Sequence, residues 1–188
     1  MILDDMFDKY VEFKILNYFM DNPTTPLYVN DISRKLKVSS GSVSTFVNKA
    51  AKNNLLIKKV VGNTHLYRLN NDLPIVRNFK ISSFLINIEK INLIQEFLKL
   101  DDSIISIVIY GSYANGTYDE KSDVDIIIIS DKKTNLQSVL QASENKLKKT
   151  INVEIFNLAE WKKISKENRA FYNSVIKSNI VLYGGELV

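Results

Sequence analysis

Residues 110–130 read YGSYANGTYDEKSDVDIIIIS, and this stretch decides the fold of the second half of the chain. It follows a run of β-branched residues at 104–109 and ends in the apolar block 126–129. Two such apolar runs separated by Gly, Ser, Asn and Asp residues are typical of buried strands joined by a turn and a loop. We therefore expect a strand, a tight turn that opens a short helix, a loop and a second buried strand.

The second strand begins beside two carboxylates, Asp123 and Asp125. Side chains two residues apart on a strand project from the same face, and two adjacent carboxylates repel each other unless a cation lies between them. A hard divalent cation such as Mg²⁺ suits this pair, because it takes oxygen ligands and usually shares them with phosphates. Gly111 lets the backbone approach a ligand closely, and Ser112 offers a hydroxyl and backbone N–H groups to an anion. The stretch therefore indicates a site for a metal ion and a polyphosphate.

The spacing of these residues resembles a known signature. Gly111-Ser112, ten intervening residues and then Asp123-Val124-Asp125 is the pattern of nucleotidyltransferases of the DNA polymerase beta superfamily, particularly the minimal nucleotidyltransferases of archaea and bacteria. The resemblance covers about residues 101–185 and implies a small mixed β-sheet with flanking helices. It also implies that Gly111 and Ser112 contact a triphosphate. The two Asp residues would be catalytic and would bind two Mg²⁺ or Mn²⁺ ions.

The family places a third carboxylate on the next strand, and Glu154 in the segment 151–156 matches it. By this resemblance Glu154 completes one metal site and helps to deprotonate the acceptor. The sequence departs from the family at Tyr113 and Asn115, where relatives often carry arginines. Lys121 is the nearby cation left to bind the nucleotide, and weaker binding or binding by basic residues further along the chain is the alternative. The alternative interpretation is an ordinary Gly-Ser turn with a surface Asp pair capping a core strand.

Composition excludes several classes of protein. The chain has 188 residues, no cysteine and one histidine, so disulfides and Cys- or His-rich zinc centres are excluded. No apolar run reaches the ~18 residues of a membrane helix, and the acidic N-terminus lacks the layout of a signal peptide. We therefore expect a cytoplasmic protein with no membrane contact.

Helical patterns at about 8–20, 30–36 and 40–53 precede two strand patterns, 55–61 and 64–70, joined at Gly62-Asn63. Within this region the run 29–69 resembles the winged helix-turn-helix family along its whole length. In this family the third helix enters the major groove and the hairpin lies along the DNA backbone. Between residues 31 and 70 eight Lys or Arg residues accompany a single acidic residue, Asp31. This charge favours double-stranded DNA as the partner, although a winged module used for protein contacts is the alternative.

The residues expected to contact DNA share two properties: they are small, polar or basic, and they lie on the outward side of the third helix or on the hairpin. They are Ser40, Ser42, Ser44, Thr45, Asn48, Lys49, Lys52, Lys58, Lys59 and Arg68.

A long linking helix is expected at about 74–100, after a helix start at Pro74. Its apolar residues cover more than one face, which suggests that the helix packs on the transferase sheet and also forms a homodimer, with burial entirely within one chain as the alternative. The sequence thus predicts an α+β chain with a winged helix-turn-helix domain at 1–72, a linking helix at 73–100 and a minimal nucleotidyltransferase domain at 101–188.

The family resemblance implies a reaction in which a nucleoside monophosphate moves from an NTP, here AMP from ATP, to an acceptor. Minimal nucleotidyltransferases often adenylylate a partner HEPN-domain ribonuclease toxin, so a toxin is the expected protein acceptor. A DNA-binding transcriptional regulator with a nucleotide-sensing or inactive transferase domain is the alternative.

Overall fold

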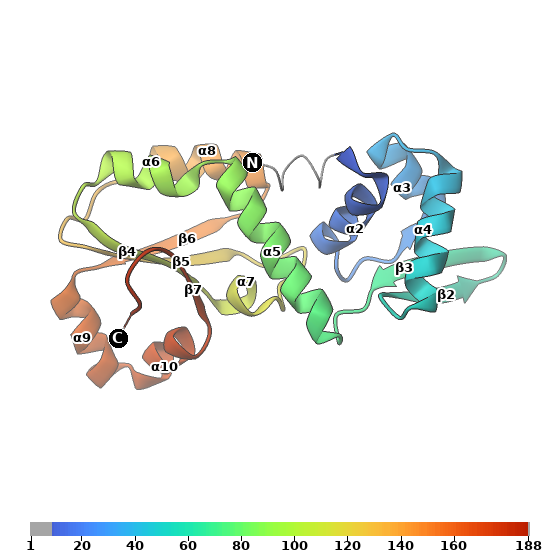
Figure 1. The fold of residues 1–188 in the computed structure, drawn as a ribbon. Helices are drawn as coiled ribbons and strands as arrows, with labels where there is room; N and C mark the ends of the chain where they lie inside the picture. The colour runs from blue at the N-terminus through green and yellow to red at the C-terminus, as the bar shows by residue number, and fades with distance from the viewer. Residues whose placement is uncertain (1–8, 188) are drawn as a thin grey trace. The chain divides into compact units, whose positions relative to one another are not determined.

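The computed structural model describes residues 9–187, which divide into two compact units (Figure 1). The first unit contains the described residues up to Ile86 together with Thr117–Lys121. The second contains Asn87–Gly116 and the described residues from Ser122 onward. Residues 1–8 of the acidic N-terminal segment, which we expected not to be a signal peptide, lie outside the described residues.

In its described part, the first unit combines short helices with a three-stranded antiparallel sheet of order β1-β3-β2. The helices are α2 (Val11–Asp21), α3 (Val29–Leu36), α4 (Ser40–Lys52) and the greater part of α5 (Pro74–Lys90), and the strands are β1 (Leu27–Tyr28), β2 (Leu56–Val61) and β3 (Thr64–Leu69). Apolar side chains of α2, α3, α4 and the sheet form one core, which includes Phe19, Ile32, Val47 and Leu69. The expected helices and hairpin are present, whereas the two-residue strand β1 was not predicted.

The second unit is a four-stranded mixed sheet of order β6-β5-β4-β7 with helices on both faces. Its strands are β4 (Ile104–Tyr110), β5 (Val124–Ser130), β6 (Ile151–Phe156) and β7 (Asn179–Gly184). Strands β5 and β6 are parallel, and α8 (Gln137–Leu147) makes the crossover that parallel strands require. The helices α6 (Leu93–Leu100) and α8 lie on one face, and α9 (Leu158–Glu167) and α10 (Arg169–Lys177) lie on the other (Figure 1). The α+β class is therefore confirmed.

The expected long linking helix is wrong in one respect, because the structure divides it in two. Helix α5 (Pro74–Lys90) and helix α6, which begins at Leu93, are separated by two residues, Ile91 and Asn92. Between them Asn92 adopts a left-handed conformation with φ of 60°, which Asn tolerates better than most residues. A single residue with this backbone interrupts the helical hydrogen bonds, so the apolar residues of 74–100 belong to two helices.

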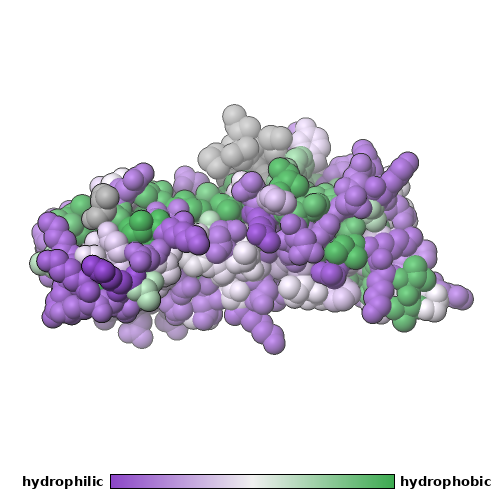
Figure 2. Space-filling model, turned by 90° about the horizontal axis from the view of Figure 1, so that it is seen from below, coloured by the Kyte–Doolittle hydropathy of each residue, from purple (hydrophilic) through white to green (hydrophobic). Residues whose placement is uncertain are grey.

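Polar side chains dominate the face of the molecule drawn in Figure 2, where apolar patches are separate from one another. Exposed large apolar residues of the first unit include Val60 and Val61 in the hairpin and Ile75 and Phe79 in α5. No helix within residues 9–187 is long and apolar enough to cross a membrane.

Candidate functional site

Gly111 lies directly against the carboxylate of Asp125. Strand β4 ends at Tyr110, which pairs with Asp125 of β5, and the chain then turns into the short helix α7 (Gly111–Asn115). Gly111 has φ of 72°, a conformation that disfavours side chains. A Cβ atom at this position would lie 3.0 Å from Oδ2 of Asp125. The turn thus brings bare backbone to one oxygen of the carboxylate.

Two polar residues that the sequence analysis did not select contact the acidic side chains. Asn152, the β6 partner of Asp125, donates a hydrogen bond from Nδ2 to Oδ1 of Asp125 over 3.1 Å. Tyr110 donates from its hydroxyl to Oε1 of Glu154 over 3.0 Å. The parallel register of β5 and β6 aligns Glu154 with Ile127 and therefore places it on the same face of the sheet as Asp125.

Tyr110 is a firm hydrogen-bond donor in this arrangement. Burial, followed by the negative charge of Glu154, raises the pKa of the Tyr110 hydroxyl well above its ordinary value. The ring also packs edge-on against Phe171 of α10, with 5.8 Å between centroids. Packing therefore holds the Tyr110 ring in place, and its hydroxyl stays protonated and donates a hydrogen bond to Glu154. The sequence signal that could have identified Tyr110 was its position directly before the Gly-Ser turn.

The expected metal-binding carboxylates are not gathered around one point, because Asp123 and Asp125 lie at the start of β5 whereas Glu154 pairs with Ile127 in the middle of that strand. Asp123 is exposed and lies one residue before β5, Asp125 is half-buried, and Glu154 is exposed. Among residues 9–187 no group of three or more His, Cys, Asp or Glu side chains is close enough to hold a metal ion. The two-Asp set with the bare backbone of Gly111 beside it still suits Mg²⁺, which often uses one or two carboxylates and completes its shell with phosphates.

Lys121 does not belong to the same unit as the rest of the predicted nucleotide site. Gly111 and Ser112 lie in the second unit, whereas Lys121 ends the segment Thr117–Lys121 of the first. Its backbone N–H donates to Oδ1 of Asp119 over 2.9 Å, which gives the loop a local turn. The side chain of Lys121 is exposed.

The residues of α4 that we expect to contact DNA are exposed, except for the half-buried Ser44. The structure divides them between two sides of the helix. Ser42, Thr45 and Lys49 line a hollow that α4 shares with the start of α2. Asn48 lies toward the hairpin, where its Oδ1 accepts a hydrogen bond from the hydroxyl of the buried Tyr67 over 2.9 Å.

The basic residues of the hairpin are likewise separated by strand alternation. Lys59 pairs with Leu66, and Arg68 pairs with Ile57, so the Lys59 and Arg68 side chains share one face of the sheet. Lys58 is on the opposite face, where its Nζ lies 5.7 Å from the centre of the Tyr67 ring. Within the predicted set, Lys59 and Arg68 are therefore the basic pair on one surface of the hairpin.

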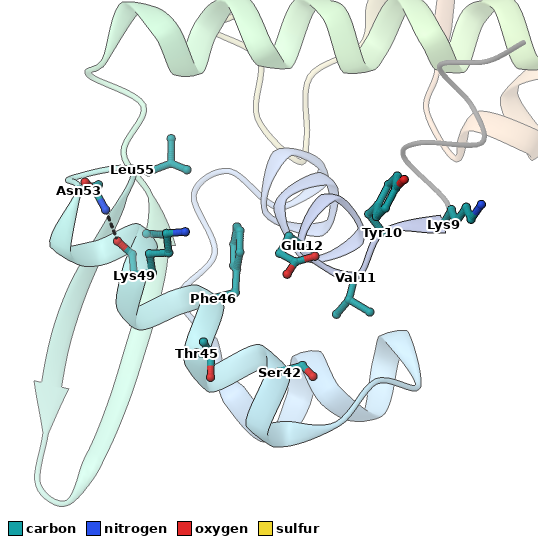
Figure 3. A pocket seen from close by; sticks show the side chains of 11 residues that line it. Lys9, Tyr10, Val11, Glu12, Ser42, Thr45, Phe46, Lys49, Asn53 and Leu55 are labelled. Atoms are coloured by element: carbon teal, nitrogen blue, oxygen red, sulfur yellow. Dashed lines mark hydrogen bonds between the residues drawn. The ribbon is translucent and has the colours of Figure 1, made fainter.

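The hollow beside α4 has a volume of about 830 Å³ and mixed chemistry (Figure 3). Phe46 and Leu55 supply apolar walls, while Lys49 and Glu12 bring opposite charges. In Figure 3 the side chain of Phe46 projects from α4 toward α2.

Residues 90–183, half of the chain, match the nucleotidyltransferase domain family. The chain belongs to this family. The match contains the Gly-Ser turn, both Asp residues and Glu154.

Two proteins of Methanocaldococcus jannaschii named as protein adenylyltransferases are similar over shorter segments. MJ0141 is 46% identical over 46 residues, which are 22% of this chain and 46% of the relative. MJ1305 is 48% identical over 44 residues, which are 21% of this chain and 30% of the relative. The matched segment thus spans less than half the length of either relative.

Two solved structures are distant neighbours of this fold. A toxin–antitoxin complex with AMP-PNP gives a TM-score of 0.38 at 18% identity, covering 51% of this chain and 74% of the solved chain. A mutant of the toxin–antitoxin pair MntA–HpeT gives a TM-score of 0.39 at 14% identity, covering 50% and 73%.

Proposed function

We propose that the second unit transfers AMP from ATP, with Mg²⁺ or Mn²⁺, to an acceptor hydroxyl. The observation that carries this proposal is the close approach of Gly111 to Asp125 in a chain of the nucleotidyltransferase domain family. Because Gly111 has a positive φ and no side chain, the backbone of the turn can lie directly against the Asp125 carboxylate, which is where the family resemblance implies that a nucleotide phosphate and its metal ion bind.

The reaction is a substitution at the α-phosphorus of the nucleotide. The acceptor oxygen forms a bond to this phosphorus, the bond to the oxygen that bridges to the β-phosphorus breaks, and pyrophosphate leaves with the bonding electron pair. The acceptor hydroxyl loses its proton to a carboxylate of the site, for which Glu154 is our candidate. Such catalysis depends mainly on positioning and charge.

Asp123 and Asp125 would hold the divalent cations, with Glu154 as a further ligand. When bound, these ions would neutralise charge on the phosphates and the leaving pyrophosphate. Asn152 fixes one oxygen of Asp125 by its hydrogen bond, and Tyr110 fixes one oxygen of Glu154. Outer partners of this kind orient ligating side chains.

A protein is the acceptor that we propose, in accord with the names of the two Methanocaldococcus jannaschii relatives. Among proteins, a HEPN-domain ribonuclease toxin is the specific candidate, because the sequence resembles minimal nucleotidyltransferases that act on such toxins.

The transferase proposal is tested with ATP labelled on the α-phosphate. The protein is incubated with Mg²⁺ and lysate from the source cells, and wild type is compared with Asp123→Asn/Asp125→Asn. We expect a labelled protein band in wild type alone, together with release of pyrophosphate. Nucleotide binding without label or pyrophosphate in any fraction would instead support a nucleotide-sensing regulator.

We propose a second function for the first unit, which is binding of double-stranded DNA by a winged helix-turn-helix module. The exposed basic residues of α4 and the hairpin support this function, as does the order of three helices and an antiparallel hairpin. Lys49 and Lys52 on α4 and Lys59 and Arg68 on the hairpin are solvent-exposed cations available to phosphates.

The test of DNA binding is its salt dependence on a duplex from the gene's own upstream region. Each phosphate contact contributes a slope of about −0.9 in a plot of log affinity against log salt. We expect Lys59→Gln to reduce the slope by about one contact, whereas Lys90→Gln, a change at the end of α5, should leave it unchanged. A wild-type protein with no salt-dependent binding would contradict the proposal.

A further inference from the structure

The loop that joins the Gly-Ser turn to Asp123 is anchored within the first unit. Its residue Glu120 accepts four hydrogen bonds from the loop between α2 and β1. The backbone N–H groups of Thr24 and Thr25 each donate over 2.9 Å, and their hydroxyls donate over 2.6 and 2.9 Å. Thr25 lies two residues before Leu27, which pairs with Tyr67 of the hairpin strand β3. Glu120 is thus fastened next to the sheet that carries the basic hairpin residues.

A second anchor in the same loop involves a buried lysine of α5. Lys80 is 1% exposed, and its Nζ donates to the backbone carbonyl oxygen of Tyr118 over 2.5 Å. The Tyr118 hydroxyl donates in return to the carbonyl oxygen of Lys80 over 3.1 Å. The same ammonium group lies 4.3 Å from the centre of the Tyr118 ring, within the range of a cation–π interaction.

These two anchors make the loop costly to separate from the first unit. Burial alone would raise the pKa of Glu120, but hydrogen bonds, chiefly from Thr24, outweigh it and lower the pKa to about 2. Removal of the loop would break the hydrogen bond from Lys80 to the Tyr118 carbonyl and the contact with the Tyr118 ring, and would leave the Asn71 side chain as the other hydrogen-bond acceptor of Lys80. We conclude that residues 117–121 move together with the first unit.

The same residues are also part of the transferase motif by chain continuity. Thr117 lies five residues after Ser112, and Lys121 lies two residues before Asp123. A segment of so few residues cannot shift without displacing the turn on one side or the carboxylates on the other. The loop is therefore fixed to the first unit, and along the chain it leads back to the Gly-Ser turn on one side and on to Asp123 on the other.

We propose that residues 117–121 couple the two activities, so that nucleotide binding at the transferase site changes the affinity of the first unit for DNA, with Glu120 as a positioning residue. This inference rests on the proposed function of each unit. Linkage requires the effect to be reciprocal, so bound DNA changes nucleotide affinity by the same factor. Couplings of this kind typically amount to about 5-fold to 150-fold.

The coupling is tested by the dissociation constant of the full chain for its upstream duplex, with and without Mg²⁺ and a non-hydrolysable ATP analogue. We expect the analogue to change the wild-type constant at least about fivefold. Thr24→Val/Thr25→Val removes two hydroxyl donors to Glu120 and should reduce the change to less than about twofold. Thr24→Ser/Thr25→Ser keeps both hydroxyls and should retain it, so the pair separates the hydrogen bonds from the mere substitution.

Further variants test whether Glu120 itself is required for the coupling. Glu120→Gln should weaken the coupling as the Val pair does, whereas Glu89→Gln, at an exposed carboxylate of α5, should not. Thermal melts show whether each variant is folded, and the wild-type measurement needs no variant. A wild type that binds both ligands with independent affinities would overturn the coupling alone. A wild type that fails to bind one of them would overturn the proposed function as well.

Discussion

Asp125 can keep its position because Gly111 carries a hydrogen atom where alanine would carry a methyl group. A Cβ atom there would meet Oδ2 of Asp125 at 3.0 Å, while φ of 72° adds backbone strain. We expect Gly111→Ala to reduce AMP transfer at least about tenfold, because a 1 Å displacement of a reacting group can cost far more than this. Initial rates with labelled ATP measure the effect.

Gly62→Ala is the matched control for this substitution. Gly62 has φ of 58°, so alanine there incurs a similar strain of about 1–2 kcal/mol. Nothing lies within 4 Å of its missing Cβ. Equal loss of transfer in both variants would show that strain, rather than contact with Asp125, explains the result at Gly111.

The hydroxyl of Tyr110 offers a second test at the level of one residue. Tyr110→Phe removes the donor to Glu154 but leaves the ring against Phe171. We expect a loss of transfer activity of about 10-fold or more, typical of outer partners of ligating side chains, with an unchanged melting temperature. Tyr172→Phe changes the same kind of hydroxyl beside Trp161 and should be silent in both assays. A matching loss in Tyr172→Phe would contradict a specific role for Tyr110.

The sequence could predict the residues whose role depends on their neighbours along the chain, but not those whose role depends on contacts between separate strands. The strand, turn and second strand that carry Gly111 and Asp125 were foreseeable because they lie within one stretch, whereas the contact between these two residues was not predicted. Tyr110 and Asn152 were missed, since their contacts depend on the register of three strands, and register is not visible in the apolar pattern alone. The separation of Lys58 from Lys59 is the opposite case, because simple strand alternation dictates it.

Among the elements, β4 and β5 are joined at one end by a buried carboxylate. Asp101 is 2% exposed and accepts hydrogen bonds from Ser103 and Ser130 as well as Thr134. We expect Asp101→Asn to lower the free energy of unfolding at pH 7 by roughly 1.5–3 kcal/mol, the range for hydrogen bonds to a charged group. Urea denaturation measures it. Asp102→Asn, at an exposed neighbour, is the control and should have a much smaller effect.

The same carboxylate gives a pH dependence with a definite sign. Burial alone would raise the pKa of Asp101, but the hydrogen bonds from Ser103 and Ser130 outweigh it and lower the pKa below its ordinary value. Its stabilising effect is therefore fully present above the unfolded pKa of about 3.9 and is lost as pH falls through the folded value. The difference between wild type and Asp101→Asn should shrink below about pH 4, and a constant difference would contradict this assignment.

Element boundaries show where sequence patterns stop being informative. The strands of the second unit were foreseeable because each is an apolar run between turn residues. The break between α5 and α6 was not, because neither Gly nor Pro marks residues 91 and 92 and the surrounding residues favour a helix. The packing of the whole unit determines the left-handed backbone conformation of Asn92.

For the whole molecule, we expect a homodimer formed through α5. Ile75 and Phe79 are four residues apart on this helix and are 54% and 37% exposed, so their side chains lie on one side of it. Light scattering should give twice the chain mass of 21.5 kDa, and Ile75→Ser/Phe79→Ser should give the monomer. Val60→Ser/Val61→Ser removes similar apolar surface from the hairpin and should remain dimeric. A wild-type monomer at every concentration would refute the dimer.

The discontinuous first unit has a consequence for how the protein is made. Its core elements emerge early from the ribosome, but Tyr118 and Glu120 belong to it and come some thirty residues after Ile86. The nascent chain must therefore keep Lys80 hydrated, or pair it otherwise, until that loop emerges. For the same reason a fragment that ends at residue 86 should be less stable than the intact unit, since it lacks the hydrogen bonds and the ring contact between Lys80 and Tyr118. Synthesis of the transferase motif is thus the step that completes the domain preceding it.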